Sequence, residues 1–261
     1  MRLRIFQVDA FTDRLFGGNP AAVCPLEDWL PDATMQAIAA ENNLAETAFF
    51  VPDGEGYALR WFTPTVEVDL CGHATLAAAF VLFELLQPGR VRVDFRTLKA
   101  GILTVVKTGE RLAMDLPSRP GKPVAASAGL SAALGRAPAQ LLAARDHLAI
   151  YDSAAEVAAL RPDLAALAQL DCMAVIATAP GENGIDFVSR FFAPKQGIPE
   201  DPVTGSAHCT LVPYWAERLG KTRLQARQIS PRGGALDCTL KGDQVTLAGR
   251  AVLYLDGIIS V

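Results

Sequence analysis

The chain has 261 residues, of which 51% are hydrophobic and 20% charged, so it can bury a substantial core and is not intrinsically disordered. Its formal net charge of -4 gives no electrostatic reason to expect binding to nucleic acid or to an anionic membrane. The longest uncharged apolar stretch, from Ala74 to Phe83, is about half of the ~20 residues that span a bilayer. The N-terminus reaches Asp9 before an apolar stretch of signal-peptide length develops. We therefore expect no membrane anchor and no export signal, and a small molecule or another protein as the partner.

The cysteines and histidines indicate neither a disulfide framework nor a metal site. Five cysteines lie far apart without a CxxC pair, at Cys24, Cys71, Cys172, Cys209 and Cys238. His147 and His208 lack the spacing of metal ligands. Reduced thiols in a cytoplasmic protein fit this pattern best.

In chain order, the sequence predicts strands around one long helix in each half. A first amphipathic helix is expected at 32–41, and a similar one at 163–170, each beginning at a Pro-Asp pair that can supply an N-terminal cap. Alternating or β-branched patterns predict strands at 47–51, 57–62, 91–95, 102–107 and 111–115. Residues 72–86 are apolar nearly all round, which predicts a central helix surrounded by strands. Its counterpart is expected at 205–218.

An internal repeat organises these elements. The segment that begins RWFTPTVEVDLCGHAT at Arg60 is echoed by SRFFAPKQGIPEDPVTGSAH from Ser189. The offset is 133 residues at Glu67/Glu200 and is kept as far as Gly109/Gly242. Chance similarity is the alternative, although paired glycines in register are hard to obtain by accident. We predict an α+β fold of two pseudo-symmetric halves, 1–117 and 118–261, with the last strand free to return to the first half.

The starts of the two long helices are candidate anion-binding sites. Each helix follows a polar loop and a glycine, and its first turn, CGHAT or TGSAH, contains no acidic residue. Free backbone N–H groups and the helix dipole favour a carboxylate there. If the halves pack about a pseudo-twofold axis, both helix starts face one cleft that holds one small anionic molecule. The expected binding groups are at Gly72, Ala74, Gly205 and Ser206. The alternative is that the glycines only permit tight turns.

Five spaced motifs resemble those of the phenazine-biosynthesis PhzF-like family, in order and over nearly the whole chain. They are GNPAAV from Gly18, NLAETAF from Asn43, FTP with EVDLCGHAT from Phe62, EDPVTGSAH from Glu200, and QIS with RGG from Gln228. The resemblance implies a diaminopimelate epimerase-like fold, in which two β-barrel-like halves each wrap around a central helix and the active site lies in the cleft. It also implies an isomerase without metal or organic cofactor that commonly forms a homodimer. The best-known member moves a proton on a dihydro-hydroxyanthranilate.

The resemblance assigns roles to individual residues. It makes Glu46 the catalytic acid/base, and a carboxylate partly buried at the entry to an apolar strand suits proton transfer. His73 and Asp201 match active-site positions where they position the reacting groups or share the proton. Ser206 offers its hydroxyl and N–H to the ligand, and Asn19 can touch the substrate. The structural alternatives are a surface carboxylate, a satisfied buried histidine, and turn or helix-start residues.

Cys71 and its counterpart Thr204 bear on the mechanism. Cofactor-independent racemases and epimerases of the related fold use two cysteines, one on each face of the α-carbon. Threonine does not ionise near neutral pH, so a two-thiol epimerase is disfavoured and Cys71 is expected to be packed and inert. The sequence therefore predicts a cofactor-independent isomerase that moves a proton on a small carboxylate-bearing metabolite, with Glu46 as acid/base. Two alternatives stay open: a non-catalytic metabolite-binding protein, and a two-base epimerase that uses Cys71 with a non-cysteine partner.

Overall fold

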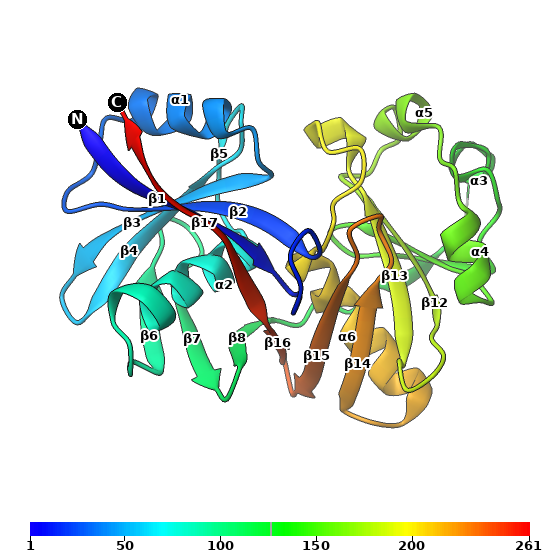
Figure 1. Ribbon diagram of the computed structural model, residues 1–261. Coiled ribbons are helices and arrows are strands. Elements are labelled where there is room, and N and C mark those ends of the chain that lie inside the picture. Colours follow the sequence, from blue (N-terminus) through cyan, green and yellow to red (C-terminus); the bar gives the residue numbers. More distant parts are fainter. Residues whose placement is uncertain (126) are drawn as a thin grey trace. The chain divides into compact units, whose positions relative to one another are not determined.

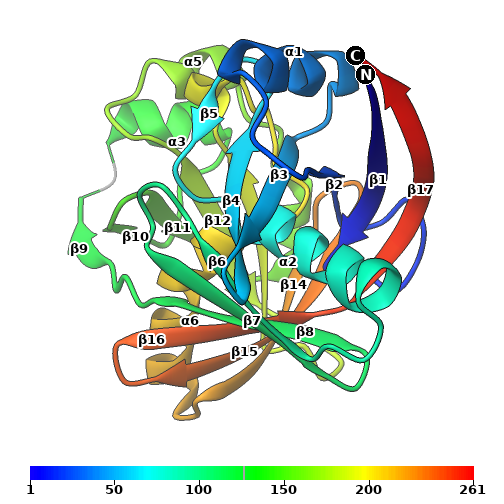
Figure 2. The same cartoon turned by 90° about the vertical axis from the view of Figure 1, so that its left-hand side faces the viewer.

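The computed structural model describes residues 1–125 and 127–261, which form two compact units (Figure 1). Unit 1 comprises residues 1–115 and 248–261, and unit 2 comprises residues 116–247. The last strand, β17 (Ala251–Ser260), pairs antiparallel with the first, β1 (Arg2–Ala10), and Figure 2 shows these two strands side by side. The C-terminal strand thus belongs to the same unit as the N-terminus.

Unit 1 is a mixed sheet that surrounds one helix. After β1 come β2 (Asn19–Pro25), β3 (Glu46–Asp53), β4 (Gly56–Phe62), β5 (Glu67–Val68), β6 (Arg92–Arg96), β7 (Ile102–Thr108) and β8 (Arg111–Pro117). Successive pairs are β1–β2 antiparallel, β2–β3 parallel, β3–β4 antiparallel, β4–β6 parallel, and β6–β7 and β7–β8 antiparallel, while β5 pairs with β4. All five strands predicted for this half are present.

The central helix of unit 1 is α2 (Gly72–Val81), which packs against β1, β2, β3, β7 and β17. Most of its residues are buried on every side, as its apolar sequence predicts. The predicted helix reaches Leu86, but its last turn, Leu82–Leu86, is π-helical, and Gln87 N donates to Leu82 O at 2.7 Å. The helix was thus predicted in place, and only its final winding differs.

Helix α1 (Asp32–Asn42) lies on the other face of the sheet from α2 (Figure 1). Met35 and Ile38 pack there against Phe49 of β3. The predicted cap is wrong at this helix: Pro31 occupies the cap position without a side-chain hydrogen bond, which moves Asp32 into the first turn. There its carboxylate accepts from Arg60 at 2.8 Å.

Unit 2 pairs its strands in the same order as unit 1. Its strands are β9 (Lys122–Val124), β10 (Gln140–Ala143), β11 (His147–Ile150), β12 (Val175–Pro180), β13 (Phe187–Phe192), β14 (Arg223–Gln228), β15 (Gly234–Lys241) and β16 (Gln244–Gly249). From β10 to β15 the pairs alternate antiparallel and parallel, as they do from β1 to β7. Helix α6 (Gly205–Leu219) lies between β13 and β14 in the chain and packs against β14 and β15. The predicted α+β class, with two barrel-like halves around one helix each, is confirmed.

The described residues of unit 2 also form four short helical segments: α3 (Ala128–Leu134), α4 (Ala154–Ala159), α5 (Leu164–Ala168) and a 3₁₀ turn (Pro194–Gln196). The predicted cap is correct at α5, where the Asp163 carboxylate accepts from Ala166 N at 3.0 Å. This helix ends sooner than the predicted 163–170, and the sequence analysis missed α3 and α4.

The cysteines are all free thiols, and Cys209 of α6 faces the core, as predicted. Burial raises the pKa of Cys24 to about 12 and that of Cys209 to about 11, so both stay protonated at neutral pH. Within the described ranges, no helix combines the length and the apolar character needed to cross a membrane.

Candidate active site

Three polar side chains meet in unit 1 where two strands and the central helix begin. Asn19 is the first residue of β2, Glu46 is the first residue of β3, and His73 is the second residue of α2. Gly18 makes the turn into β2 with φ of +60°, and a Cβ at this position would lie 2.1 Å from the carbonyl oxygen of Ala10. Only glycine fits this backbone, so Gly18 fixes where Asn19 enters the sheet.

The imidazole of His73 has a polar neighbour at each ring nitrogen. Its Nε2 lies 3.1 Å from Glu46 Oε2, and its Nδ1 lies 3.2 Å from Asn19 Nδ2 and 3.5 Å from Cys71 Sγ. The side chains of His73 and Glu46 are 5% and 12% exposed. The Nε2–Oε2 contact lacks the alignment of a full hydrogen bond, and neither atom has another hydrogen-bond partner among the described residues. Such facing, unsatisfied buried atoms are unusual in a folded core and typical of a functional site.

The surroundings affect the protonation of the Cys71 thiol and of the His73 imidazole differently. Burial raises the pKa of Cys71 to about 11, with a contribution from Glu46, so Cys71 is a neutral thiol at neutral pH. Burial of the His73 ring opposes its charged form, but Cys71 and Glu46 together raise the pKa of His73 well above its usual value. Because the thiol is uncharged near neutral pH, the Glu46 carboxylate is the anion that favours a proton on this ring.

The start of α2 leaves its first-turn amides without a side-chain cap. Cys71 is the N-cap residue in an extended conformation, and its side chain makes no capping hydrogen bond. Its carbonyl instead accepts from the hydroxyl of Thr75 at 2.6 Å. The first turn contains no acidic residue, and Gly72 is partly exposed whereas Ala74 is fully buried. Of the two predicted amide donors here, Gly72 is the one that lies nearer the surface of unit 1.

In unit 2, Asp201 belongs to a buried network at the start of α6. The hydroxyl of Thr204, the N-cap residue, donates to Asp201 Oδ2 instead of capping the helix. Gln228 Nε2 donates to the Asp201 carbonyl at 2.7 Å, and Gln228 Oε1 accepts from Thr204 N at 2.9 Å. Gln228 has no exposed surface and Asp201 has 8%. The sequence motif that contains Gln228 gives this residue no role, and the structure shows that it holds the loop before α6.

Ser206, beside Gly205 in the first turn of α6, receives a hydrogen bond that the sequence analysis missed. Arg145 Nη2 donates to Ser206 Oγ at 3.1 Å. The same guanidinium pairs at 3.0 Å with Asp146, whose side chain is only 2% exposed. A buried carboxylate therefore orients a cation at the start of α6. Nothing in the sequence pattern separates Arg145 from other arginines, because 61 residues lie between it and Ser206.

His208, two residues further along α6, differs from His73. Its Nδ1 lies 2.8 Å from the carbonyl oxygen of Thr204, which can only accept, so Nδ1 carries the ring proton. Burial lowers the pKa of His208 to about 4, which keeps the ring neutral at physiological pH. His208 is a core residue of unit 2, consistent with its not having been assigned to the site.

Glu46, Cys71 and His73 also form a cluster whose possible metal-ligating atoms lie within 4.8 Å of one another. The thiol faces Nδ1 and the carboxylate faces Nε2, on opposite sides of the imidazole. An ion bound to one ring nitrogen would leave the other ring nitrogen facing its present neighbour. The absence of a metal cofactor stays a prediction.

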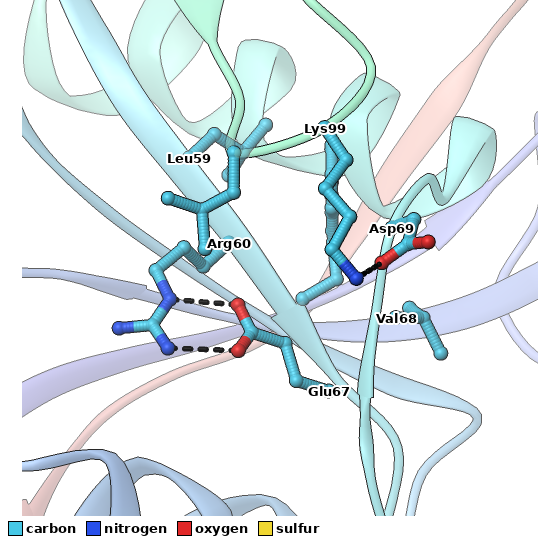
Figure 3. A pocket seen from close by; sticks show the side chains of 8 residues that line it. Leu59, Arg60, Glu67, Val68, Asp69 and Lys99 are labelled. Atoms are coloured by element: carbon cyan, nitrogen blue, oxygen red, sulfur yellow. Dashed lines mark hydrogen bonds and ion pairs between the residues drawn. The ribbon is translucent and has the colours of Figure 1, made fainter.

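A separate pocket of about 130 Å³ in unit 1 contains neither Glu46 nor His73. Figure 3 shows that its charged side chains pair with one another: Arg60 binds Glu67 through two hydrogen bonds of 2.7 and 2.8 Å, and Lys99 lies 2.9 Å from Asp69. Because these charges are already paired, the pocket offers no unpaired charge for a substrate carboxylate.

Comparison with known proteins gives one consistent family. Residues 8–257 match the PhzC-PhzF family model, described as phenazine biosynthesis-like protein. An uncharacterized isomerase of Pseudomonas aeruginosa is 53% identical over 259 residues, which is 99% of each chain. A crystal structure of a PhzF-family phenazine biosynthesis protein from Enterococcus faecalis matches with a TM-score of 0.97 and 46% identity over 100% of both chains.

Structural similarity at low sequence identity extends to an epimerase. A hydroxyproline epimerase of Agrobacterium vitis, solved with bound trans-4-hydroxy-L-proline, has a TM-score of 0.64 over 99% of this chain and 92% of that one. At 12% identity this likeness shows the fold alone.

Proposed function

The chain belongs to the PhzC-PhzF family of phenazine biosynthesis-like proteins and is an isomerase, and from that premise we propose that it moves a proton on a small carboxylate-bearing metabolite without a cofactor. Glu46 is the acid/base in this proposal. Its homodimeric state and cytoplasmic location stay predictions.

The observation that carries the proposal is the buried contact between Glu46 Oε2 and His73 Nε2 at 3.1 Å, in which neither atom has another hydrogen-bond partner among the described residues. A structural ion pair would be fully hydrogen-bonded, because an unsatisfied buried polar atom is costly. A catalytic pair is often poorly aligned until the substrate arrives. The arrangement therefore favours a group that takes and returns a proton.

The proposed reaction breaks one C–H bond and forms another. Glu46 takes the proton while the C–H electron pair moves into the adjacent unsaturated system of the substrate, and the protonated carboxyl then returns the proton to a second carbon. His73 supports the carboxylate through Nε2. The backbone N–H of Gly72, at the uncapped start of α2, binds the substrate carboxylate and its developing charge. No oxidant, reductant or co-substrate is required.

A two-base epimerase that uses Cys71 is the second candidate. Its support is that Cys71 lies 3.5 Å from His73 Nδ1, within the same cluster as Glu46. Against it, burial raises the pKa of this thiol to about 11, which disfavours the thiolate that a base requires. A carboxylate that takes and returns the proton alone is the simpler mechanism for these residues.

The test is a mass-spectrometric screen of small cyclic and amino carboxylic acids in deuterated water. Wild type is compared with Glu46→Gln, and Glu41→Gln, a change at an exposed position of α1, is the matched control. We expect isomerisation or deuterium at carbon with wild type and the control, and a rate at least about 100-fold lower with Glu46→Gln. Equal rates for all three proteins would exclude Glu46 as the base. Binding without exchange in both wild type and Glu46→Gln would instead favour the non-catalytic binding protein.

A further inference from the structure

We propose that Asn19 is a positioning residue that holds His73 as the neutral tautomer with its proton on Nε2, facing Glu46. This inference rests on the proposed function of Glu46 and His73, and it gives Asn19 a different task from the substrate contact that the sequence suggests. Three observations carry it: the place of Asn19 in the sheet, the donor and acceptor roles of the facing atoms, and the charges around the ring.

The backbone holds Asn19 in one place. It is the first residue of β2, it pairs with Ala10 of β1, and its side chain lies in a position with no exposed surface. The preceding turn requires glycine at Gly18, because a side chain there would clash with the carbonyl oxygen of Ala10, and this turn sets where β2 begins. The amide therefore stays against His73 and is not free to follow a ligand.

The facing atoms determine the tautomer. Asn19 Nδ2 lies 3.2 Å from His73 Nδ1, and an amide nitrogen can only donate, so Nδ1 must be a bare acceptor. A neutral imidazole with bare Nδ1 carries its proton on Nε2, which is 3.1 Å from Glu46 Oε2. The reverse neutral tautomer would place bare Nε2 against the carboxylate, two acceptors with no proton between them. If the amide were turned, its oxygen would require a proton on Nδ1, and the ring would become an imidazolium.

The choice thus lies between the neutral Nε2–H ring and the imidazolium. Glu46 favours the imidazolium, whereas burial of the ring opposes it. Cys71, the other titratable group against the ring, is a thiol at neutral pH and brings no charge. Cys71 is the largest cause that raises the pKa of His73, and its uncharged thiol does not act as an anion at neutral pH. Burial of the ring and the Asn19 donor at Nδ1 therefore oppose Glu46 alone, and together they favour the neutral ring.

A neutral His73 suits a carboxylate base. Its Nε2–H supports one oxygen of Glu46 without neutralising the group, and the other oxygen stays available for the substrate proton. An imidazolium at the same place would form a buried ion pair and stabilise the carboxylate, which makes it a weaker base. Asn19 would then raise the rate of the proton transfer without touching the reacting atoms.

The experiment is 15N NMR of protein labelled at its three histidines, with His73 assigned by its absence from the spectrum of His73→Gln. For wild type at neutral pH we expect one protonated nitrogen, Nε2, and one bare nitrogen, Nδ1. Asn19→Asp places a pure acceptor at Nδ1, so both nitrogens should become protonated. Gln36→Leu, which removes another amide in unit 1 that donates to Thr63 O at 2.8 Å, is the control and should leave His73 unchanged.

The wild-type spectrum tests the proposal even if Asn19→Asp does not fold. A doubly protonated His73 in wild type at neutral pH would overturn it, and so would an identical His73 signal in wild type and Asn19→Asp. These readouts need no substrate, so they stay valid if the proposed function fails. With a substrate identified, we expect Asn19→Asp to lower kcat about 10-fold or more and to change KM less than about twofold. A change in KM alone would make Asn19 a substrate contact and overturn the positioning role.

Discussion

The two units contain the same arginine–glutamate pair in different surroundings, and this difference predicts unequal losses of stability. In unit 2, Arg190 binds Glu200 through hydrogen bonds of 2.7 and 2.8 Å and donates to the carbonyls of Val157 and Leu160 at 3.2 and 2.9 Å. The Arg190 and Glu200 side chains are 10% and 17% exposed. Arg190→Met keeps most of the apolar stem but leaves a carboxylate and two carbonyls without their donor. Removing one partner of a buried pair costs about 3–5 kcal/mol.

Arg60 of unit 1 is the matched control. Its side chain is similarly buried, at 12%, but its partners Glu67 and Asp32 are 32% and 76% exposed. Water can replace the guanidinium at both carboxylates, so we expect Arg60→Met to lower the free energy of unfolding by only about 1 kcal/mol. The difference between the two variants should then be about 2 kcal/mol or more.

Urea unfolding followed by tryptophan fluorescence measures this difference, since Trp61 is buried in unit 1 and Trp215 in unit 2. Equal losses in the two variants, or a larger loss for Arg60→Met, would show that burial of the partners does not determine the loss of stability. Arg190→Met combined with Glu200→Leu should recover part of the stability, because it also removes the unpaired buried carboxylate.

Three further outcomes are expected. Arg145→Gln should lower the free energy of unfolding by about 1 kcal/mol or more, because the Asp146 side chain, which is only 2% exposed, loses its guanidinium partner, and an unchanged urea midpoint would contradict this. The folded-state pKa of His208, about 4, lies below its usual 6.5, so the unfolded chain binds this proton first as pH falls. Wild type should therefore lose about 2 kcal/mol more than His208→Asn between about pH 6.5 and pH 5, and equal losses would contradict this. Gly18→Ala should destabilise unit 1 by at least about 1 kcal/mol, since its Cβ meets Ala10 O at 2.1 Å, and an unchanged urea midpoint would count against that clash.

The fold could be predicted where one pattern dominates. The apolar sequence from Ala74 to Phe83 predicts a helix that is buried on every side, and α2 is buried in this way among the strands of unit 1. Helix caps, which depend on a single side-chain hydrogen bond, were harder to predict from the sequence. Two similar Pro-Asp pairs gave a side-chain cap at Asp163 but none at Asp32, because only the second aspartate occupies the N-cap position. Sequence spacing alone does not distinguish these two positions.

In the candidate site, too, some features could be predicted from the sequence and others could not. The motifs singled out Glu46 and His73 together, and the structure brings their side chains to 3.1 Å. The contact between Asn19 and His73 was not predicted, because 54 residues separate them and it depends on how β2 and α2 both begin. Arg145 was missed for a similar reason, since only the fold of unit 2 brings it to Ser206. Motifs thus predict residue types in a site better than the contacts that orient them.

In the proposed mechanism the Glu46 carboxylate, and not the Cys71 thiol, moves the proton. The most direct measurement compares Glu46→Gln and Cys71→Ser in the same assay of solvent deuterium entering substrate carbon. Both changes are nearly isosteric, and serine keeps a donor beside His73 while removing the thiol. We predict a loss of at least about 100-fold for Glu46→Gln and a change within about threefold for Cys71→Ser. The opposite pattern would exclude Glu46 as the acid/base and support a two-base epimerase that uses Cys71.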